Sequence, residues 1–102
     1  MRSYIITESR DSLLGMRLAG VDGVRLKEPD AIEAAFKKAV KDADIGIIYM
    51  TELAYNMVSE MVDDFKQKHH FPLITIIPDR EGFHDPGRKN IVSRYIRESV
   101  GL

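Results

Sequence analysis

The stretch Asp44-Ile45-Gly46-Ile47-Ile48-Tyr49-Met50-Thr51 decides how the rest of this chain is interpreted. Nearly every position is apolar, and the run is too short for a lone helix, so it predicts a strand. A strand with one wet face would alternate polar and apolar residues, whereas this strand has no polar face and must be covered on both sides. Thr51 and Glu52 have the form of a helix N-cap followed by a first-turn acid. A doubly buried strand that leads into a helix indicates a parallel α/β sheet with this strand at its centre.

Four elements are predicted before this strand. Residues 3–7 form a first strand, and a short helix capped by Asp11 or Ser12 runs to Ala19, after which Gly20 supplies a left-handed cap. Residues 23–27 alternate apolar and basic side chains, which predicts an edge strand. A helix then begins at Pro29, where the missing N–H of proline is tolerated. Its apolar stripe consists of Ile32, Ala35, Phe36, Ala39, Val40 and Ala43.

After the central strand, one helix over about residues 52–68, a strand over residues 71–77 and a further helix are predicted. The apolar stripe of the first of these helices is Ala54, Met57, Val58, Met61, Val62 and Phe65, and core packing explains its methionines without a cofactor. A loop over residues 78–87 separates this sheet domain, about residues 1–78, from the last helix, about residues 88–100. The apolar stripe of the last helix is Ile91, Val92, Tyr95, Ile96 and Val100.

The predicted fold is therefore a single α/β domain with a four-stranded parallel sheet flanked by helices, as in receiver and flavodoxin-like proteins. The first and third strands lack a wet face and belong in the middle, which gives the strand order 2-1-3-4. Right-handed crossovers place the helices that follow the second and third strands on one face and the short first helix on the other. The last helix is expected to cover the remainder of that second face.

Composition limits the function. The chain has 102 residues and a net charge of −1, which argues against nucleic acid as the main partner. No apolar run approaches the roughly 20 residues that span a bilayer, and no signal peptide is evident, so membrane insertion is not expected. The absence of cysteine removes disulfides and thiolate chemistry, and it fits a reducing cytoplasm.

Ligands of open α/β sheets bind where the chain switches direction across the sheet, here between the first and third strands. The two flanking loops carry neither GxGxxG nor a P-loop, so no phosphate cradle is present. Glu8 and Glu52 are candidates for an acid pair or a Mg²⁺ site, although electrostatic support of two helix starts is their more ordinary role.

Two other polar groups are weaker candidates. His69 and His70 are adjacent, so their side chains point apart, and they are interpreted as surface loop residues. The last loop contains Glu81, His84 and Asp85, but no regular structure orients them as metal ligands. The residues themselves favour a module without catalytic residues, cofactor or metal.

Three segments resemble the F subunit of the rotary V-type and archaeal A-type ATPases and ATP synthases. Residues 12–21, Ser-Leu-Leu-Gly-Met-Arg-Leu-Ala-Gly-Val, are similar to the family's Leu-Gly-Phe-Arg-Leu-Ala-Gly-Val stretch. Residues 44–52 are similar to its central strand, and residues 72–78, followed by a helix ending at residues 96–102, are similar to its final part. The chain departs from the family where Met16 replaces the usual Phe and where Thr7-Glu8 replaces a frequent Gly-Asp.

The resemblance implies a non-catalytic component of the central stalk in the soluble sector, cytoplasmic and peripheral to the membrane. Its implied partners are the coiled-coil D subunit, the catalytic A/B hexamer and the subunit that connects the stalk to the membrane ring. Such a rotor would couple ATP hydrolysis or synthesis to ion transport. The expected partner-binding residues are Arg88, Arg94, Arg97 and Glu98 on the last helix, together with Arg17.

Two alternatives remain open from the sequence. A receiver-like signalling domain shares the predicted fold, but it needs an aspartate at the end of the central strand, where this chain has Tyr49-Met50-Thr51. A small-ligand-binding module would use the switch point between the first and third strands, with Glu8 and Glu52 as its polar groups.

Overall fold

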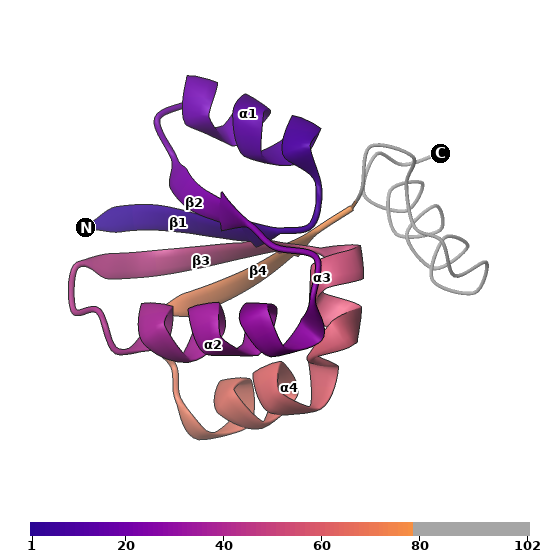
Figure 1. The fold of residues 1–102 in the computed structure, drawn as a ribbon. Coiled ribbons are helices and arrows are strands. Elements are labelled where there is room, and N and C mark those ends of the chain that lie inside the picture. The colour runs from indigo at the N-terminus through magenta and orange to yellow at the C-terminus, as the bar shows by residue number, and fades with distance from the viewer. Residues whose placement is uncertain (79–102) are drawn as a thin grey trace, which may run out of the picture.

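The computed structural model describes residues 1–78. Its four parallel strands form one sheet in the order β2-β1-β3-β4, which confirms the predicted α/β fold and strand order (Figure 1). The predicted last helix, residues 88–100, and residues 79–87 of the predicted loop lie outside the described part of the chain. The elements are β1 (Arg2–Thr7), α1 (Arg10–Leu18), β2 (Asp22–Arg25), α2 (Pro29–Val40), β3 (Ile45–Thr51), α3 (Glu52–Met57), α4 (Ser59–Lys68) and β4 (Leu73–Ile77).

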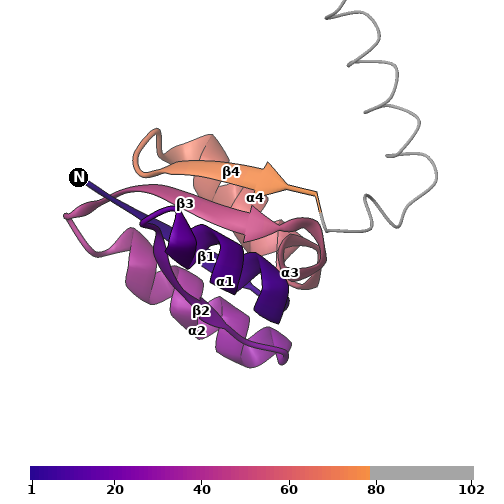
Figure 2. The same ribbon diagram turned by 90° about the horizontal axis from the view of Figure 1, so that it is seen from above.

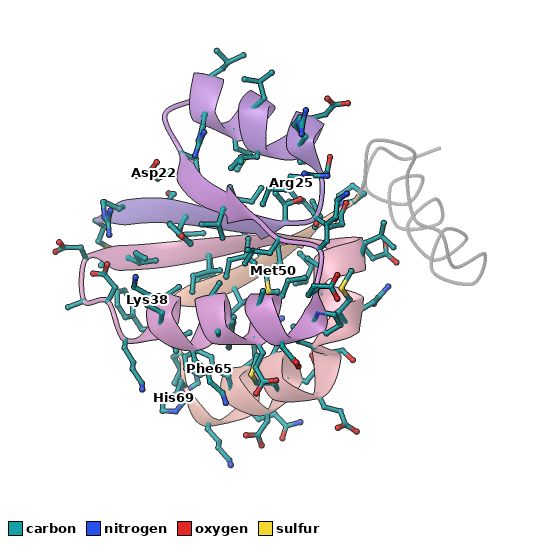
Figure 3. All side chains as sticks on the ribbon, viewed as in Figure 1. Asp22, Arg25, Lys38, Met50, Phe65 and His69 are labelled. Atoms are coloured by element: carbon teal, nitrogen blue, oxygen red, sulfur yellow. The ribbon has the colours of Figure 1, made fainter. Side chains whose placement is uncertain are left out.

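The helices form two unequal layers on the sheet. Helices α2, α3 and α4 lie on one face and α1 lies on the other, as right-handed crossovers require (Figures 1 and 2). The main core lies between the sheet and helices α2, α3 and α4. Here the ring of Phe36 meets the ring of Phe65 edge to face, with 5.5 Å between the ring centres. Figure 3 shows Met50 of β3 between the sheet and α2.

Strand β3 is the centre of the sheet, as its apolar sequence predicts. It pairs in parallel with β1 on one side and β4 on the other, and Ile45, Ile48 and Met50 are buried. Gly46 of this strand is buried. A Cβ atom on Gly46 would lie 2.7 Å from Sδ of Met1, so it is the side chain of the first residue that crosses this position.

Helix α1 begins earlier than predicted. The N-cap is Ser9, not Asp11 or Ser12, because Oγ of Ser9 accepts a hydrogen bond of 3.1 Å from the amide of Ser12. All three residues are good caps, so sequence preference alone does not choose between them. Gly20 has φ = 88°, which confirms the left-handed turn predicted after this helix.

The single helix predicted over residues 52–68 is wrong, because the chain forms two helices that meet at Val58. Val58 has φ = −136° and ψ = 29°, outside helical geometry, and its amide donates a 3.0 Å hydrogen bond to the carbonyl of Tyr55. Asn56, Val58 and Ser59 are weak helix formers, which makes this the place where the helix breaks at least cost.

The remaining boundaries differ by a few residues. Strand β2 covers residues 22–25 in place of 23–27, and β4 begins at Leu73, after a cis peptide bond between Phe71 and Pro72. Helix α2 begins at Pro29 as predicted but ends at Val40, so Ala43 lies in the following loop. Within residues 1–78, no helix combines the length and apolar character needed to cross a membrane.

Candidate interaction surface

The carboxyl ends of β1 and β3 meet in a hydrogen-bonded chain. Oγ1 of Thr51 donates to the carboxylate of Glu8, so its only proton is used there. Thr7 therefore donates to Thr51 over the 3.0 Å that separates the two hydroxyl oxygens. The amide of Ser9 in turn donates to Oγ1 of Thr7 at 3.0 Å. The hydroxyls of both threonines are thus engaged within the protein.

This chain of hydrogen bonds fastens the two central strands where they end. Thr7 and Thr51 are fully buried, so the hydroxyl of each needs a hydrogen-bond partner inside the protein. The two hydroxyls meet this need by bonding to each other. Thr51 occupies the N-cap position of α3 as predicted, but its side chain does not cap the helix. Nε of Arg25 donates to the carbonyl of Glu8 at 3.1 Å and adds a link to the edge strand (Figure 3). The arrangement is structural, since its polar groups satisfy one another.

The two glutamates proposed as a ligand or metal site have different environments. The carboxylate of Glu8 is half-buried against Thr51, whereas Glu52 begins α3 and is only 1% exposed. Among residues 1–78, no three histidine or acidic side chains are grouped closely enough to hold a metal ion. The described part of the chain therefore gives no support to the Mg²⁺ alternative.

The other candidate residues named from the sequence lie on the surface, at the edge of the core or outside the described residues. His69 follows α4 on the surface, and its ring stacks on that of Phe65 at 4.6 Å (Figure 3). Met61 packs against the core as predicted, whereas Met57 is partly exposed. Glu81, His84 and Asp85 lie outside the described residues, as do four of the five predicted partner-binding residues, Arg88, Arg94, Arg97 and Glu98.

The fifth, Arg17, is exposed in the last turn of α1. It lines a hollow of about 530 Å³ at the amino end of the sheet, together with Met1, Arg2, Ser3, Ala19, Gly20, Val21 and Asp22. Its side chain is available to a partner in the described part of the structure.

Helix α1 also presents apolar side chains to the outside. Leu14 is 57% exposed and Leu18, one turn later, is 83% exposed, while no residue of α1 is fully buried. Adjacent turns on one helix face form a stripe suited to contact with another helix. The sequence carries a signal for this exposure, because four apolar residues in six exceed what one buried face needs; they are Leu13, Leu14, Met16 and Leu18.

A second apolar surface lies beside α1, on the same face of the sheet. Helix α1 packs against β1 and β2, and in Figure 2 no described element covers β4 on this face. Alternation along the strands turns Ile47 and Tyr49 of β3 toward this face. The register pairs them with Leu73 and Thr75 of β4, and Leu73 is 56% exposed. We call these four residues, with Ile77, the open face.

The open face was predicted only in outline. The sequence of β3 shows that both of its faces must be covered, and the structure shows that the described helices cover one of them. Contiguous exposed apolar surface on folded proteins is commonly a place where another segment or another protein packs, so the open face is a candidate for such contact.

The sequence of this chain is similar to those of known proteins. Residues 4–96 match the model of the family described as ATP synthase (F/14-kDa) subunit. The F subunit of the A-type ATP synthase of Methanococcoides burtonii is 25% identical over 95% of this chain and 92% of its own length. The corresponding F subunit of Methanothermobacter thermautotrophicus is 30% identical over 76% of this chain and 73% of its own length.

A eukaryotic relative is also similar. The F subunit of the V-type proton ATPase of Arabidopsis thaliana is 28% identical over 82% of this chain and 73% of its own length. The family match spans β1 to β4 and continues beyond the described residues, so it rests on the whole fold and not on one motif. This chain belongs to the family of the ATP synthase (F/14-kDa) subunit.

Proposed function

We propose that this chain is a non-catalytic subunit of the central stalk of a rotary A-type or V-type ATPase or ATP synthase. In this role it binds the coiled-coil D subunit and turns with it inside the A/B hexamer, so that ATP hydrolysis or synthesis is coupled to ion transport. It acts in the cytoplasm, outside the membrane, and also contacts the subunit that joins the stalk to the membrane ring. Family membership over residues 4–96 supports this proposal.

The observation that carries the proposal is the exposed apolar surface on the outer side of α1. The exposed leucines of α1, Leu14 and Leu18, are one turn apart, as are the contacts that a coiled-coil helix makes with a neighbour. Arg17 lies beside them and supplies charge at the rim of the same surface. A long helical partner with apolar and acidic positions fits this combination.

We assign the last helical segment two roles. Its apolar stripe, Ile91 to Val100, covers the open face, and its other side presents Arg94, Arg97 and Glu98 to the D subunit. The chemistry of its residues supports this division, since one side is apolar and the other is charged.

The direct experiment is co-expression with the D subunit of the same genome and then size-exclusion chromatography. The two chains are expected to elute as one complex, and the double variant Arg94→Glu, Arg97→Glu is expected to bind more weakly. Single rim ion pairs contribute only about 0–1 kcal/mol, so both arginines are reversed together. Circular dichroism of the variant controls for folding. Separate elution of the wild-type chain and the D subunit would contradict the proposal.

A further inference from the structure

A second hollow lies on the opposite face of the sheet from the open face, between α2, the starts of β1 and β3, and Val24 of β2. Its volume is about 540 Å³, enough for one or two side chains of another molecule. We call it the α2 hollow. It is lined by Arg2, Tyr4, Val24, Ala35, Lys38, Ala39, Lys41, Asp42 and Ile45.

The floor of the α2 hollow is apolar. Ala35 and Ala39 are one turn apart on α2, and their short side chains leave space between the helix and the sheet. Val24 and Ile45 close the hollow from the strands. A preformed apolar depression of this kind accepts an anchoring side chain at a protein interface.

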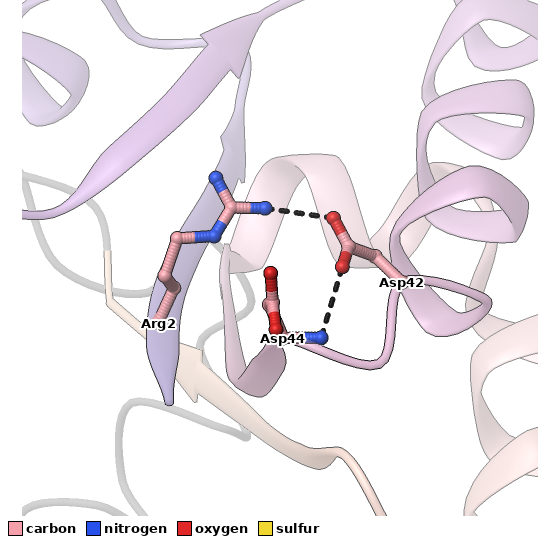
Figure 4. A network of polar contacts seen from close by, with 3 residues as sticks. All are labelled: Arg2, Asp42 and Asp44. Atoms are coloured by element: carbon pink, nitrogen blue, oxygen red, sulfur yellow. Dashed lines mark hydrogen bonds and ion pairs between the residues drawn. The ribbon is translucent and has the colours of Figure 1, made fainter.

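The rim of the hollow is positively charged. Asp42 is the one acid in its lining, and its negative charge is compensated within the protein. Its carboxylate forms a 2.7 Å ion pair with Arg2 and accepts a 2.9 Å hydrogen bond from the amide of Asp44 (Figure 4). Lys38 and Lys41 have no ion-pair partner within residues 1–78. The neighbouring Lys37, by contrast, pairs with Glu33 one turn earlier on the same helix.

Tyr4 adds a neutral donor to this lining. Burial raises the pKa of its hydroxyl, the nearby Asp22 raises it further, and Arg2 opposes both. The hydroxyl therefore keeps its proton at physiological pH and is able to donate to an acceptor. Two ammonium groups, one hydroxyl donor and an apolar floor together select a partner that carries carboxylates next to an apolar side chain.

We propose that the α2 hollow is a second docking surface, and that its occupant is an acidic segment of another protein, with an apolar residue on Ala35 and Ala39 and carboxylates against Lys38 and Lys41. Charge complementarity favours this occupant, because Lys38 and Lys41 form a local positive patch on a chain whose net charge is −1. The identity of that protein as another component of the complex rests on the proposed function. Because α2 and α1 lie on opposite faces of the sheet, a segment in the α2 hollow and a partner on the outer side of α1 would not compete for space.

The test uses the complex purified from cells that co-express this chain with the other stalk and hexamer subunits of the same genome. A carbodiimide joins a lysine amine to a carboxylate without a spacer, so it reports direct contact. We expect Lys38 or Lys41 to be joined to an acidic residue of another protein of the complex. Lys37 and Lys68 serve as internal controls, since they should be joined to Glu33 and Asp64 of this chain.

Two variants test the same surface by affinity. Lys38→Glu with Lys41→Glu is expected to weaken assembly at least tenfold, and Ala35→Leu, which fills the floor without a change of charge, is expected to weaken it too. The control is Lys66→Glu with Lys68→Glu on α4, an equal charge change away from the hollow. Thermal melting of each isolated variant verifies its fold.

The outcomes separate this inference from the proposed function. If the complex forms, the two lysines give no link to another protein and all variants assemble normally, the α2 hollow is not a docking surface while the stalk assignment stands. Crosslinks between differently isotope-labelled copies of this chain would overturn the proposed occupant, because they would show that a second copy of the chain binds the α2 hollow. If the wild-type chain does not assemble at all, both proposals are overturned.

Discussion

Two glycines in the strands on either side of β1, Gly23 in β2 and Gly46 in β3, differ in what surrounds them. A Cβ atom on Gly23 would collide with the side chain and the backbone oxygen of Ile5, whereas one on Gly46 would meet only the side chain of Met1. Met1 is 95% exposed, so its side chain moves aside easily, but Ile5 is buried in a central strand. The consequences of the same substitution should therefore differ.

We expect Gly23→Ala to lower the free energy of unfolding by about 1–3 kcal/mol, the usual effect of overpacking. For Gly46→Ala we expect a change of less than about 0.5 kcal/mol, since the exposed side chain of Met1 is free to shift. Urea unfolding followed by circular dichroism measures both. Equal losses for the two variants would show that Met1 is held as firmly as Ile5.

Tyr4 predicts a pH dependence. Its folded-state pKa lies above the ordinary value of 10.0, chiefly because of burial and then because of Asp22. Above pH 10 the unfolded chain releases this proton while the folded chain retains it, so the unfolded state binds fewer protons and stability falls as pH rises. The contribution is complete below pH 10 and is lost as pH rises through the folded-state pKa.

The measurement is the melting temperature of the wild-type chain and of Tyr4→Phe between about pH 8 and pH 11, on either side of the ordinary tyrosine pKa. The wild-type chain should lose more stability over this range than the variant does. Tyr49→Phe is the matched control, since it removes a hydroxyl from the same sheet. Parallel curves for the wild-type chain and Tyr4→Phe would contradict the assignment.

At the scale of elements, α1 is the helix with least packing support among those of residues 1–78. It has no fully buried residue, and Gly15 in its middle has no atom within 4 Å of the place where a Cβ would stand. Gly15→Ala should therefore stabilise the chain by about 0.5–1 kcal/mol, because alanine loses less backbone freedom in a helix. Chemical denaturation tests this, and a destabilised variant would mean that another segment packs closely on this position.

How far each element could be predicted depends on the range of the interactions that form it. The apolar run from Ile45 to Thr51 contains its own signal, so the central strand and, through crossover rules, the strand order follow from the sequence. The break at Val58 depends on how two short helices fit one core, which local propensity only hints at. The helix start at Ser9 was missed because several residues offer equivalent caps.

The candidate surfaces were less predictable than the fold. The link between Thr7 and Thr51 joins residues 44 positions apart, and it exists because β1 and β3 end at the same edge of the sheet. The α2 hollow exists because two alanines of α2 face the starts of two strands, and alanines on a helix give no such signal in sequence. Charge and composition identify residues able to bind a partner, but the fold decides which of them gather.

At the scale of the whole molecule, the sheet has one face that the described helices cover and one that they cover only in part. If the stripe from Ile91 to Val100 covers the open face, two leucines of nearly equal exposure in residues 1–78 should differ in their burial in the full-length chain. Leu73 lies on the open face at 56% exposed, and Leu14 lies on the outer side of α1 at 57% exposed. The same substitution at both positions therefore tests the proposal in the isolated full-length chain.

We expect Leu73→Lys to lower the free energy of unfolding of the isolated chain by about 1–2 kcal/mol, part of the roughly 1.5–3 kcal/mol that full burial of a leucine contributes. For Leu14→Lys we expect no change beyond about 0.5 kcal/mol, as for an ordinary surface position, but weaker binding to the D subunit. Urea unfolding gives the first quantity and titration calorimetry with the purified D subunit gives the second. If Leu73→Lys leaves the stability of the isolated chain unchanged and weakens the complex instead, the open face binds the partner. A lysine at a solvent-exposed position does not destabilise the isolated chain, and its cost arises only when a second protein covers it and removes its water.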